Sequence, residues 1–519
     1  MSLAKTAAFF EEFIDNRLNP ILVRELRQMV RSRFIVVMLN LYVGLLTLVC
    51  LGFVMFSAIL QEEGAGMALF GSLASIMGFS SFFVVILYTG IVTASERINA
   101  DLMYASAIKP RQVILGKFFS GLILSLLLFS AVFPFFTLAY LLRGLDFYTF
   151  LTTTYLIFLA IHTVNSVVIF IASSLRTTVQ MIFYGLLAFF LLFPMTFQVI
   201  GVLIFVGPRM GFGVMGYWEM IIYPTLYSLS IIGFFLIAGI VIVSPPSSNR
   251  MFPMRLFLTL WFLFSFAFIL YLKWAYGTMF SSPDIVNVWC VFHLGMLTTF
   301  IVFLASERDA WNFRIRRTIP RISVLRLFVF PFYTGAACGL VWWLGYLGAI
   351  IVAFCLFGDH TGFDSNEFLN MFCLTLFVFN YFYTAMIIRA KFLSRRVSPG
   401  KTWAVALCLG TLLSLGSTLI YFLFTFQDTR LSFLEGYDES FLSIFNPFPL
   451  LFQLSGYGSS HQLFPQSYGA LVWAAALTPY LIYWVIARMV HFSPEPTDED
   501  KELLAIVEQQ AEESRQTAK

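Results

Sequence analysis

Three groups of residues in this chain have types and spacings that could support chemistry or binding. The first is Gly400-Lys401-Thr402, which matches the end of a phosphate-binding loop of the form G-x-x-x-x-G-K-[ST]. That pattern requires glycine at position 395, where the chain has Arg395, and no buried strand leads into the segment. The segment is better interpreted as a basic turn. We therefore expect this chain to carry no ATP site and no catalytic site of its own.

The second group consists of polar residues inside apolar segments. His162 and Asn165 share one face of a predicted helix with Ser166. They could line a substrate path, or they could form hydrogen bonds between neighbouring helices. His293 and Asn380 have the same two interpretations. Lys and Asp are absent from the centres of the apolar segments, which argues against a carrier that uses an intramembrane charge relay.

The six cysteines give no sign of metal or disulfide chemistry. All of them fall inside apolar runs, and no two have the C-x-x-C spacing. Cysteines in such surroundings behave as small apolar residues. We therefore predict neither a metal site nor a disulfide framework.

The third group is a charged stretch between two long apolar runs. It carries both signs of charge on helix-forming sequence, a combination that fixes the register of a contact with a soluble protein. A plain connection between membrane helices has no need of so many charges. We therefore predict that this stretch docks a protein partner through Glu96, Arg97, Asp101, Lys109, Pro110, Arg111 and Lys117.

The apolar runs that surround this stretch predict a membrane protein. The chain has 519 residues, of which 59% are hydrophobic and 12% charged. A helix of about 20 apolar residues crosses the hydrocarbon core of a bilayer. Twelve runs are long enough, and the chain is predicted to be an all-α polytopic membrane protein. The runs lie near 34–59, 67–94, 113–142, 150–173, 178–206, 221–243, 256–276, 285–304, 327–357, 366–388, 402–426 and 469–490.

The distribution of basic residues predicts the topology of these twelve spans. If residues 1–33 are cytoplasmic, the cytoplasmic connections and ends hold 28 of the 32 Lys and Arg residues. Such a bias follows the positive-inside rule and places both termini in the cytoplasm. The net charge of +4 then reflects orientation in the membrane. No soluble basic face with interleaved aromatic residues is present, so we expect no nucleic-acid binding.

Short matches between the two halves predict an internal duplication. Three segments recur in the same order and at the same topological positions, which indicates two parallel six-helix repeats. The alternative is chance similarity among basic segments that flank membrane spans. The matches pair Ala94–Arg97 with Ala305–Arg308, Pro110–Phe118 with Pro320–Phe328, and Asn16–Pro20 with Asn249–Pro253.

Four regions follow from these observations. Residues 1–33 end in an amphipathic helix, with Asn19 as N-cap, Pro20 at the first helical position and an apolar face of Leu22, Val23, Leu26, Met29 and Val30. We expect this helix to form an elbow in the cytoplasmic interface, with Arg24, Arg27 and Arg31 directed toward lipid phosphates. The first repeat covers 34–243 and the second 244–490. Residues 491–519 form an acidic cytoplasmic tail.

The elbow and the charged stretch resemble a known family, the permease subunits of type-2 ATP-binding-cassette (ABC) exporters. "NPILVRELRQMVRSRF" is similar to the elbow that opens many bacterial members, and "SERINADLMYASAIKPRQVILGKF" is similar to their connection between the second and third helices. In that family this connection is a coupling helix that docks a separate ATPase. The chain departs from the usual pattern at residues 100–103. The second copy, with Glu307, Arg308, Pro320 and Arg321, lacks the Gly-Lys pair.

The resemblance implies an exporter permease in the cytoplasmic (inner) membrane of a bacterium. It implies that ATP binds a partner ATPase subunit, that this chain holds no cofactor, and that accessory subunits could join. An amphipathic or lipid-linked substrate would suit a path between the halves. The alternative is a multispan membrane enzyme, such as a glycosyltransferase with a lipid-linked donor. Glu62-Glu63 is the only suggestive acidic pair for that function, and its loop is too short to build a donor site.

Overall fold

The structure is a computed structural model, and it describes ten stretches of the chain together with three isolated residues. Each of the two compact units, Met1–Pro245 and Pro246–Lys519, is described by itself. The described residues are 19–60, 65–98, 109–142, 147–174, 177, 180, 217–245, 247–275, 284–309, 311–358, 363–425, 446 and 465–495.

The described residues confirm eleven of the twelve predicted membrane spans. Eleven helices there are long and apolar enough to cross a bilayer. The one remaining predicted run, 178–206, lies outside the described residues, apart from Gln180. The chain is therefore an all-helical, multi-pass membrane protein.

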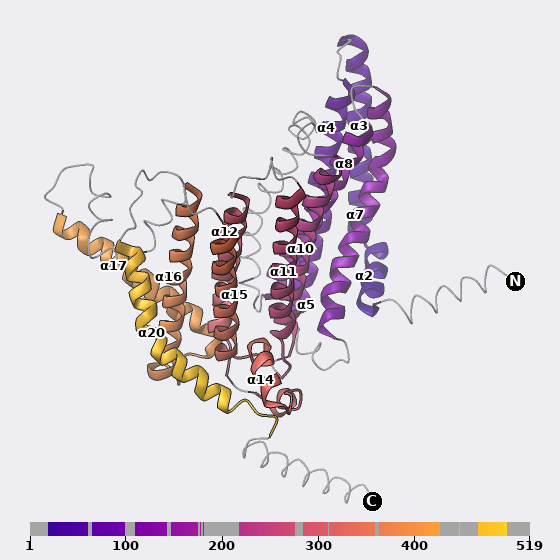
Figure 1. Ribbon diagram of the computed structural model, residues 1–519. Helices are drawn as coiled ribbons and strands as arrows, with labels where there is room; N and C mark the ends of the chain where they lie inside the picture. The colour runs from indigo at the N-terminus through magenta and orange to yellow at the C-terminus, as the bar shows by residue number, and fades with distance from the viewer. Residues whose placement is uncertain are drawn as a thin grey trace, which may run out of the picture. The chain divides into compact units, whose positions relative to one another are not determined.

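Unit 1 is a helical bundle preceded by a short helix (Figure 1). Helix α7 packs against α2, α3, α4 and α8, and α8 also contacts α5 and α10. A π-helical segment, η1, joins α4 to α5, so that one continuous span of 31 residues runs from Gly66 to Glu96. The helices are α2 (Pro20–Arg31), α3 (Arg33–Leu60), α4 (Ala65–Ser81), η1 (Phe82–Leu87), α5 (Tyr88–Ile98), α7 (Pro110–Leu141), α8 (Phe147–Ser174) and α10 (Tyr217–Val243).

Aromatic side chains fill the core of unit 1. The rings of Phe70, Phe136 and Phe150 lie 5.1 to 5.7 Å apart and join α4, α7 and α8. Tilted and edge-to-face ring pairs of this kind stabilise packing beyond the area that they bury. Lipid tails are as apolar as these side chains, so close packing must hold the bundle together.

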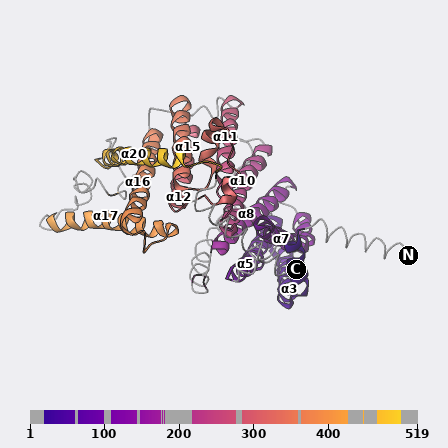
Figure 2. The ribbon, with the colours of Figure 1, turned by 90° about the horizontal axis from the view of Figure 1, so that it is seen from below.

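Unit 2 is a second helical bundle, in which α12 packs against both α15 and α16 (Figures 1 and 2). Trp343 of α15 stacks on Phe379 of α16 with ring centroids 4.7 Å apart. The helices are α11 (Phe252–Ala275), α12 (Asp284–Ala305), α13 (Phe313–Arg316), α14 (Ser323–Val329), η2 (Phe330–Phe332), α15 (Ala336–Phe357), α16 (Phe363–Phe392), η3 (Pro399–Lys401), α17 (Thr402–Thr425) and α20 (Pro465–Val490).

The predicted run 327–357 is broken, and its span begins later than predicted. Helix α14 and the short η2 end at Phe332, and the spanning helix α15 begins at Ala336. Gly335 between them has φ 143°, a backbone conformation that only glycine adopts without strain. The break exposes backbone groups that bind the side chains described below.

Several helices present apolar surface outward, as lipid contact requires. In the most apolar part of α3, only 22% is buried by the rest of the chain. The corresponding share is 11% for α17 and 11% for α20. A helix that is apolar on all sides and little buried by protein is stable only if another apolar phase covers it. These faces agree with association of the chain with a lipid bilayer.

The elbow helix forms as predicted at its start, but its buried face differs from the prediction. Asn19 caps α2 by accepting a hydrogen bond from the backbone N–H of Ile21, and Pro20 occupies the first turn. The buried face contains Glu25, whereas Val30 is 81% exposed. The reason is electrostatic, because the Glu25 carboxylate meets a buried ammonium group on α7.

Candidate functional site

The two predicted segments of unit 1, the elbow and the charged stretch, meet in one cluster of four charged residues. The ion-pair junction, as we name it, consists of Arg24 and Glu25 on α2, Glu96 on α5, and Lys117 on α7. Lys117 Nζ lies 2.7 Å from Glu96 Oε2 and 3.2 Å from Glu25 Oε1. Arg24 pairs with both carboxylates as well. Two acids and two bases thus join three helices.

Burial makes the inner half of this junction costly to disturb. Glu25 is 1% exposed and Lys117 is 3% exposed. A buried carboxylate and a buried ammonium group are stable only as a pair, because each has lost its hydration. The charge of Lys117, predicted to serve docking, is therefore used within the chain.

The outer half of the junction is open to solvent. The side chain of Arg24 is 52% exposed and that of Glu96 is 33% exposed. Burial lowers the pKa of Arg24, but the nearby carboxylates of Glu96 and Glu25 outweigh this effect and raise the pKa overall. Arg24 was predicted to face lipid phosphates. It pairs with two carboxylates of its own chain, and its orientation toward lipid phosphates stays a prediction.

Backbone contacts strengthen the attachment of α2 to α7. The side chain of Asn19 donates from Nδ2 to the carbonyl oxygen of Gln112, at 2.5 Å. Gly116 permits a close approach, since a Cβ atom there would lie 2.9 Å from the Cβ of Ile21. The Gly116-Lys117 pair, which carries part of the family resemblance, thus has a local function. The glycine admits α2, and the lysine pairs with Glu25 of that helix.

The remaining residues of the predicted docking stretch lie at its two ends or outside the described chain. Lys109 and Arg111 are exposed at the start of α7, and Pro110 is its first residue. The side chain of Gln112 accepts a hydrogen bond from the backbone N–H of Lys109, which caps this end. Asp101 and the side chain of Arg97 lie outside what the structure describes.

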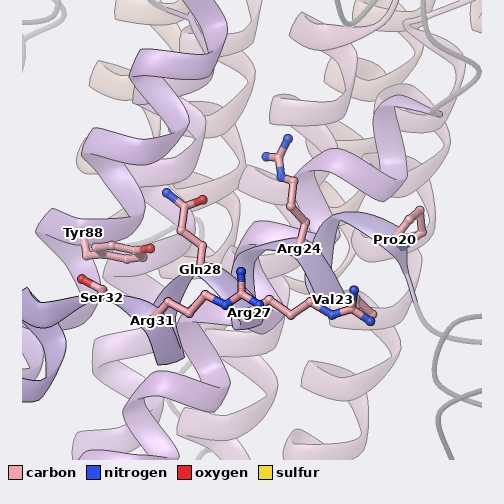
Figure 3. Close-up of a pocket in the computed structure, with 8 residues that line it drawn as sticks. All are labelled: Pro20, Val23, Arg24, Arg27, Gln28, Arg31, Ser32 and Tyr88. Atoms are coloured by element: carbon pink, nitrogen blue, oxygen red, sulfur yellow. The ribbon is translucent and has the colours of Figure 1, made fainter. Parts of the chain in front are cut away.

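An open, basic pocket of about 800 Å³ lies against the elbow. Figure 3 shows Tyr88 and Ser32 at one end of it and Pro20 and Val23 at the other, with the arginines between. Guanidinium groups bind phosphate and carboxylate oxygens through paired hydrogen bonds. Arg24, Arg27 and Arg31, the three predicted elbow arginines, all line this pocket and give it a capacity for anions.

The polar residues predicted to line a path make hydrogen bonds between helices. His162 and Asn165 both belong to α8. His162 Nε2 lies 2.8 Å from the hydroxyl of Ser125 on α7, and Asn165 accepts a hydrogen bond from Thr89 on α5 at 2.6 Å. Both residues are buried, as are His293 and Asn380 of unit 2. The interhelical interpretation is confirmed for His162 and Asn165. A role of these residues in a substrate path stays a prediction.

Unit 2 contains a buried ion pair that the sequence analysis did not identify. Arg255 of α11 is 0% exposed, and its guanidinium lies 2.5 Å from the Glu307 carboxylate. The same guanidinium donates to the carbonyl oxygens of Pro331 and Tyr333. Glu307 also accepts from the backbone N–H of Gly335, at 2.6 Å. Burial raises the pKa of Glu307, an effect that Arg255 opposes.

Of the second predicted docking segment, the described residues place Glu307 inside the protein and Arg308 and Arg321 on its surface, with Pro320 half-buried. Among the described residues, no group of three or more His, Cys, Asp or Glu side chains could hold a metal ion. Gly400 and Lys401 lie in the short turn η3 before α17. A phosphate-binding loop follows a strand, whereas this turn follows a bend.

Comparisons of the chain with protein-family profiles, with curated proteins and with solved structures find no match.

Proposed function

We propose that this chain is the membrane-spanning permease subunit of an ABC exporter, powered by a separate ATPase on the cytoplasmic side of a bacterial inner membrane. The eleven described spans and the cytoplasmic bias of basic residues support a membrane permease. The resemblance of the elbow and the charged stretch to those of exporter permeases supports the partner. An amphipathic or lipid-linked molecule is the substrate class in this proposal.

The observation that carries the proposal is the ion-pair junction. The candidate docking segment, Ser95–Lys117, begins in the last turns of α5, which ends at Ile98, and ends within the first turns of α7, which begins at Pro110. Glu96 and Lys117 pair directly across its base. Both ends of the segment are therefore fixed to each other and to α2. A protein that pushes on such a segment moves three helices together.

The length of α7 supports the transfer of motion into the membrane. Its 32 residues extend for about 48 Å, which exceeds the roughly 30 Å of a hydrocarbon core. Lys117 lies in the second turn, so the junction acts near the first end of this helix, ahead of the internal Pro134. Between Lys117 and Pro134, α7 contributes Leu124 and Leu128 to the core of unit 1, so a displacement at its first turn is passed to that core.

The test uses the exposed charges at the start of α7. The full chain carrying Lys109→Glu and Arg111→Glu is purified from native membranes in mild detergent, and co-purifying ATP hydrolysis is measured. Like charges brought together at a protein contact cost several kcal/mol. We therefore expect ATPase activity to fall at least tenfold at unchanged yield of the permease. Glu96 is unsuitable for this test because its loss would disrupt the junction itself.

The matched control is Arg395→Glu with Arg396→Glu, two exposed arginines in the turn after α16. We expect ATP hydrolysis to co-purify with this control as it does with the unaltered chain. If no ATPase activity accompanies the unaltered chain, or if both double variants lose it equally, the proposed docking of an ATPase at α7 is wrong.

A further inference from the structure

The loop between α12 and α15 of unit 2, which is predicted to lie in the cytoplasm, carries four exposed arginines. The basic surface, as we name it, consists of Arg308, Arg314, Arg317 and Arg321. No acid balances it within the described part of this loop. Glu307 is buried against Arg255, and Asp309 accepts from the backbone N–H of Ala337 and lies 3.8 Å from Arg488. The surface is therefore strongly cationic.

The chain returns to this loop after α20. Phe492, two residues beyond α20, is 2% exposed. Its ring lies edge-on to those of Trp311, Phe330 and Tyr333, with centroids 5.1 to 5.2 Å away. An aromatic side chain enclosed in this way fixes the segment that carries it. The end of α20 is accordingly held beside α14 (Figure 1).

A buried arginine completes this anchor. Arg316 is 8% exposed, and its Nη1 atom donates to the carbonyl oxygens of His491, Ser493 and Glu495 at 3.3 to 3.4 Å. Arg314 and Arg317 of the basic surface are its close neighbours in the chain. The carbonyl oxygen of Glu495, where the described chain ends, therefore lies within hydrogen-bond distance of an arginine that stands between Arg314 and Arg317 in the sequence.

The residues that follow the anchor have the opposite charge. Residues 496–519 contain seven Asp and Glu residues against three Lys and Arg. Asp498, Glu499 and Asp500 begin three residues after Glu495, a distance that the chain spans in about 10 Å. An anionic membrane surface repels such a segment, whereas the basic surface attracts it.

We propose that residues 496–519 bind the basic surface of the same chain. The anchor supplies a short tether, and short tethers give effective concentrations in the millimolar range. A weak electrostatic contact is then sufficient for occupancy. Because both groups are exposed, salt at high concentration screens the contact and releases the tail. If the proposed function holds, the bound tail covers Arg308 and Arg321 of the second docking segment and leaves the first one open.

Photo-crosslinking of the full chain tests this proposal without any ATPase. The photoreactive p-benzoylphenylalanine replaces Gln509, and the protein is purified in a neutral detergent without added anionic lipid. After irradiation at about 50 mM salt, we expect the tail to be linked to residues 306–326 of the same chain, as mapped by mass spectrometry. We expect the yield to fall at least fivefold at about 0.5 M salt.

Two sets of variants locate the contact. Asp498→Asn, Glu499→Gln, Asp500→Asn and Glu502→Gln together change only the tail, which lies outside the predicted membrane spans. Arg308→Glu, Arg314→Glu, Arg317→Glu and Arg321→Glu change only exposed residues. Each set should lower the crosslink at least fivefold, whereas Arg395→Glu with Arg396→Glu should leave it unchanged. The proposal would be overturned if the crosslinks map to another part of the chain or only to detergent or lipid. It would also be overturned if the crosslink persists in both sets of variants.

Discussion

Each unit contains an ion pair between a glutamate and an arginine, and the two pairs differ in how far they are exposed to solvent. In each, the glutamate of an Ala-Ser-Glu-Arg segment pairs with an arginine from the segment that opens the unit: Glu96 with Arg24, and Glu307 with Arg255. The pair of unit 1 is half exposed and shared with Glu25 and Lys117. The pair of unit 2 is fully buried and hydrogen-bonded to backbone groups.

The internal duplication stays a prediction, but the two arginines differ in where they lie within their units. Arg24 belongs to a separate helix ahead of the first span, four residues after Pro20, whereas Arg255 is inside the spanning helix, two residues after Pro253. A pair that links separate helices at a water boundary can transmit motion between them. A buried pair that is hydrogen-bonded to backbone carbonyl groups instead holds those groups in place. The coupling role is therefore proposed for unit 1.

The largest effect is expected from breaking the buried pair of unit 2. Arg255→Met leaves Glu307 buried without its counter-ion, at a cost of about 3–5 kcal/mol in stability. The measurement is unfolding of the purified protein by SDS in mixed micelles. Adding Glu307→Leu removes the orphaned charge and should recover most of the loss. A single variant as stable as the unaltered chain would show that this pair does not stabilise unit 2.

A smaller loss is expected in the buried half of the junction of unit 1. Lys117→Met leaves Glu25 with Arg24 alone, so we expect about 2–3 kcal/mol of destabilisation in the same assay. Lys117→Arg keeps the charge and should retain more of the stability. Equal losses for both variants would mean that side-chain volume, and not charge, holds α2 against α7.

The backbone break of unit 2 should be sensitive to one methyl group. Gly335→Ala places a Cβ atom 3.0 Å from an Asp309 carboxylate oxygen, at a φ of 143°. The strain should cost about 1–3 kcal/mol. Gly345→Ala is the control, because its Cβ meets no atom within 4 Å. That control should be unchanged or more stable, and a Gly335→Ala protein with unaltered unfolding would contradict the role given to this glycine.

The smallest effect on stability is expected at the exposed half of the junction. Arg24→Gln removes a pair whose members are 52% and 33% exposed, and exposed pairs contribute about 0–1 kcal/mol. Unfolding should therefore be nearly unchanged. A loss as large as that of Lys117→Met would mean that Arg24 is as important to the fold as the buried lysine, and that the contrast between the two halves of the junction is wrong.

Local rules predicted the parts of this fold that depend on local sequence. The spans follow from runs of apolar residues, and the start of α2 follows from Asn19 and Pro20. The buried face of α2 was missed because Glu25 shares it with Leu22 and Met29, and only a partner from α7 makes that burial favourable. A carboxylate at helical spacing from apolar residues was the available signal.

The long-range contacts could not be predicted from the sequence. The pairing of Arg255 with Glu307 joins residues 52 positions apart, and it depends on a backbone break that Gly335 permits. The anchor of Phe492 depends on three aromatic residues from another loop. Their identities are visible in the sequence, but their distances follow from how the helices of unit 2 pack.

The π-helical segment Phe82–Leu87 determines which way the end of its span faces. A π turn holds one more residue than an α turn, and such segments fit an extra residue without turning the helix on either side. Removing one residue within 82–87 should therefore restore a plain α-helix and leave Glu96 aimed at Lys117. Removing one residue from 88–95 should instead rotate Glu96 by about 100° around the axis and part the two charges. The span thus contains a short stretch where chain length can change while the angular position of Glu96 is kept.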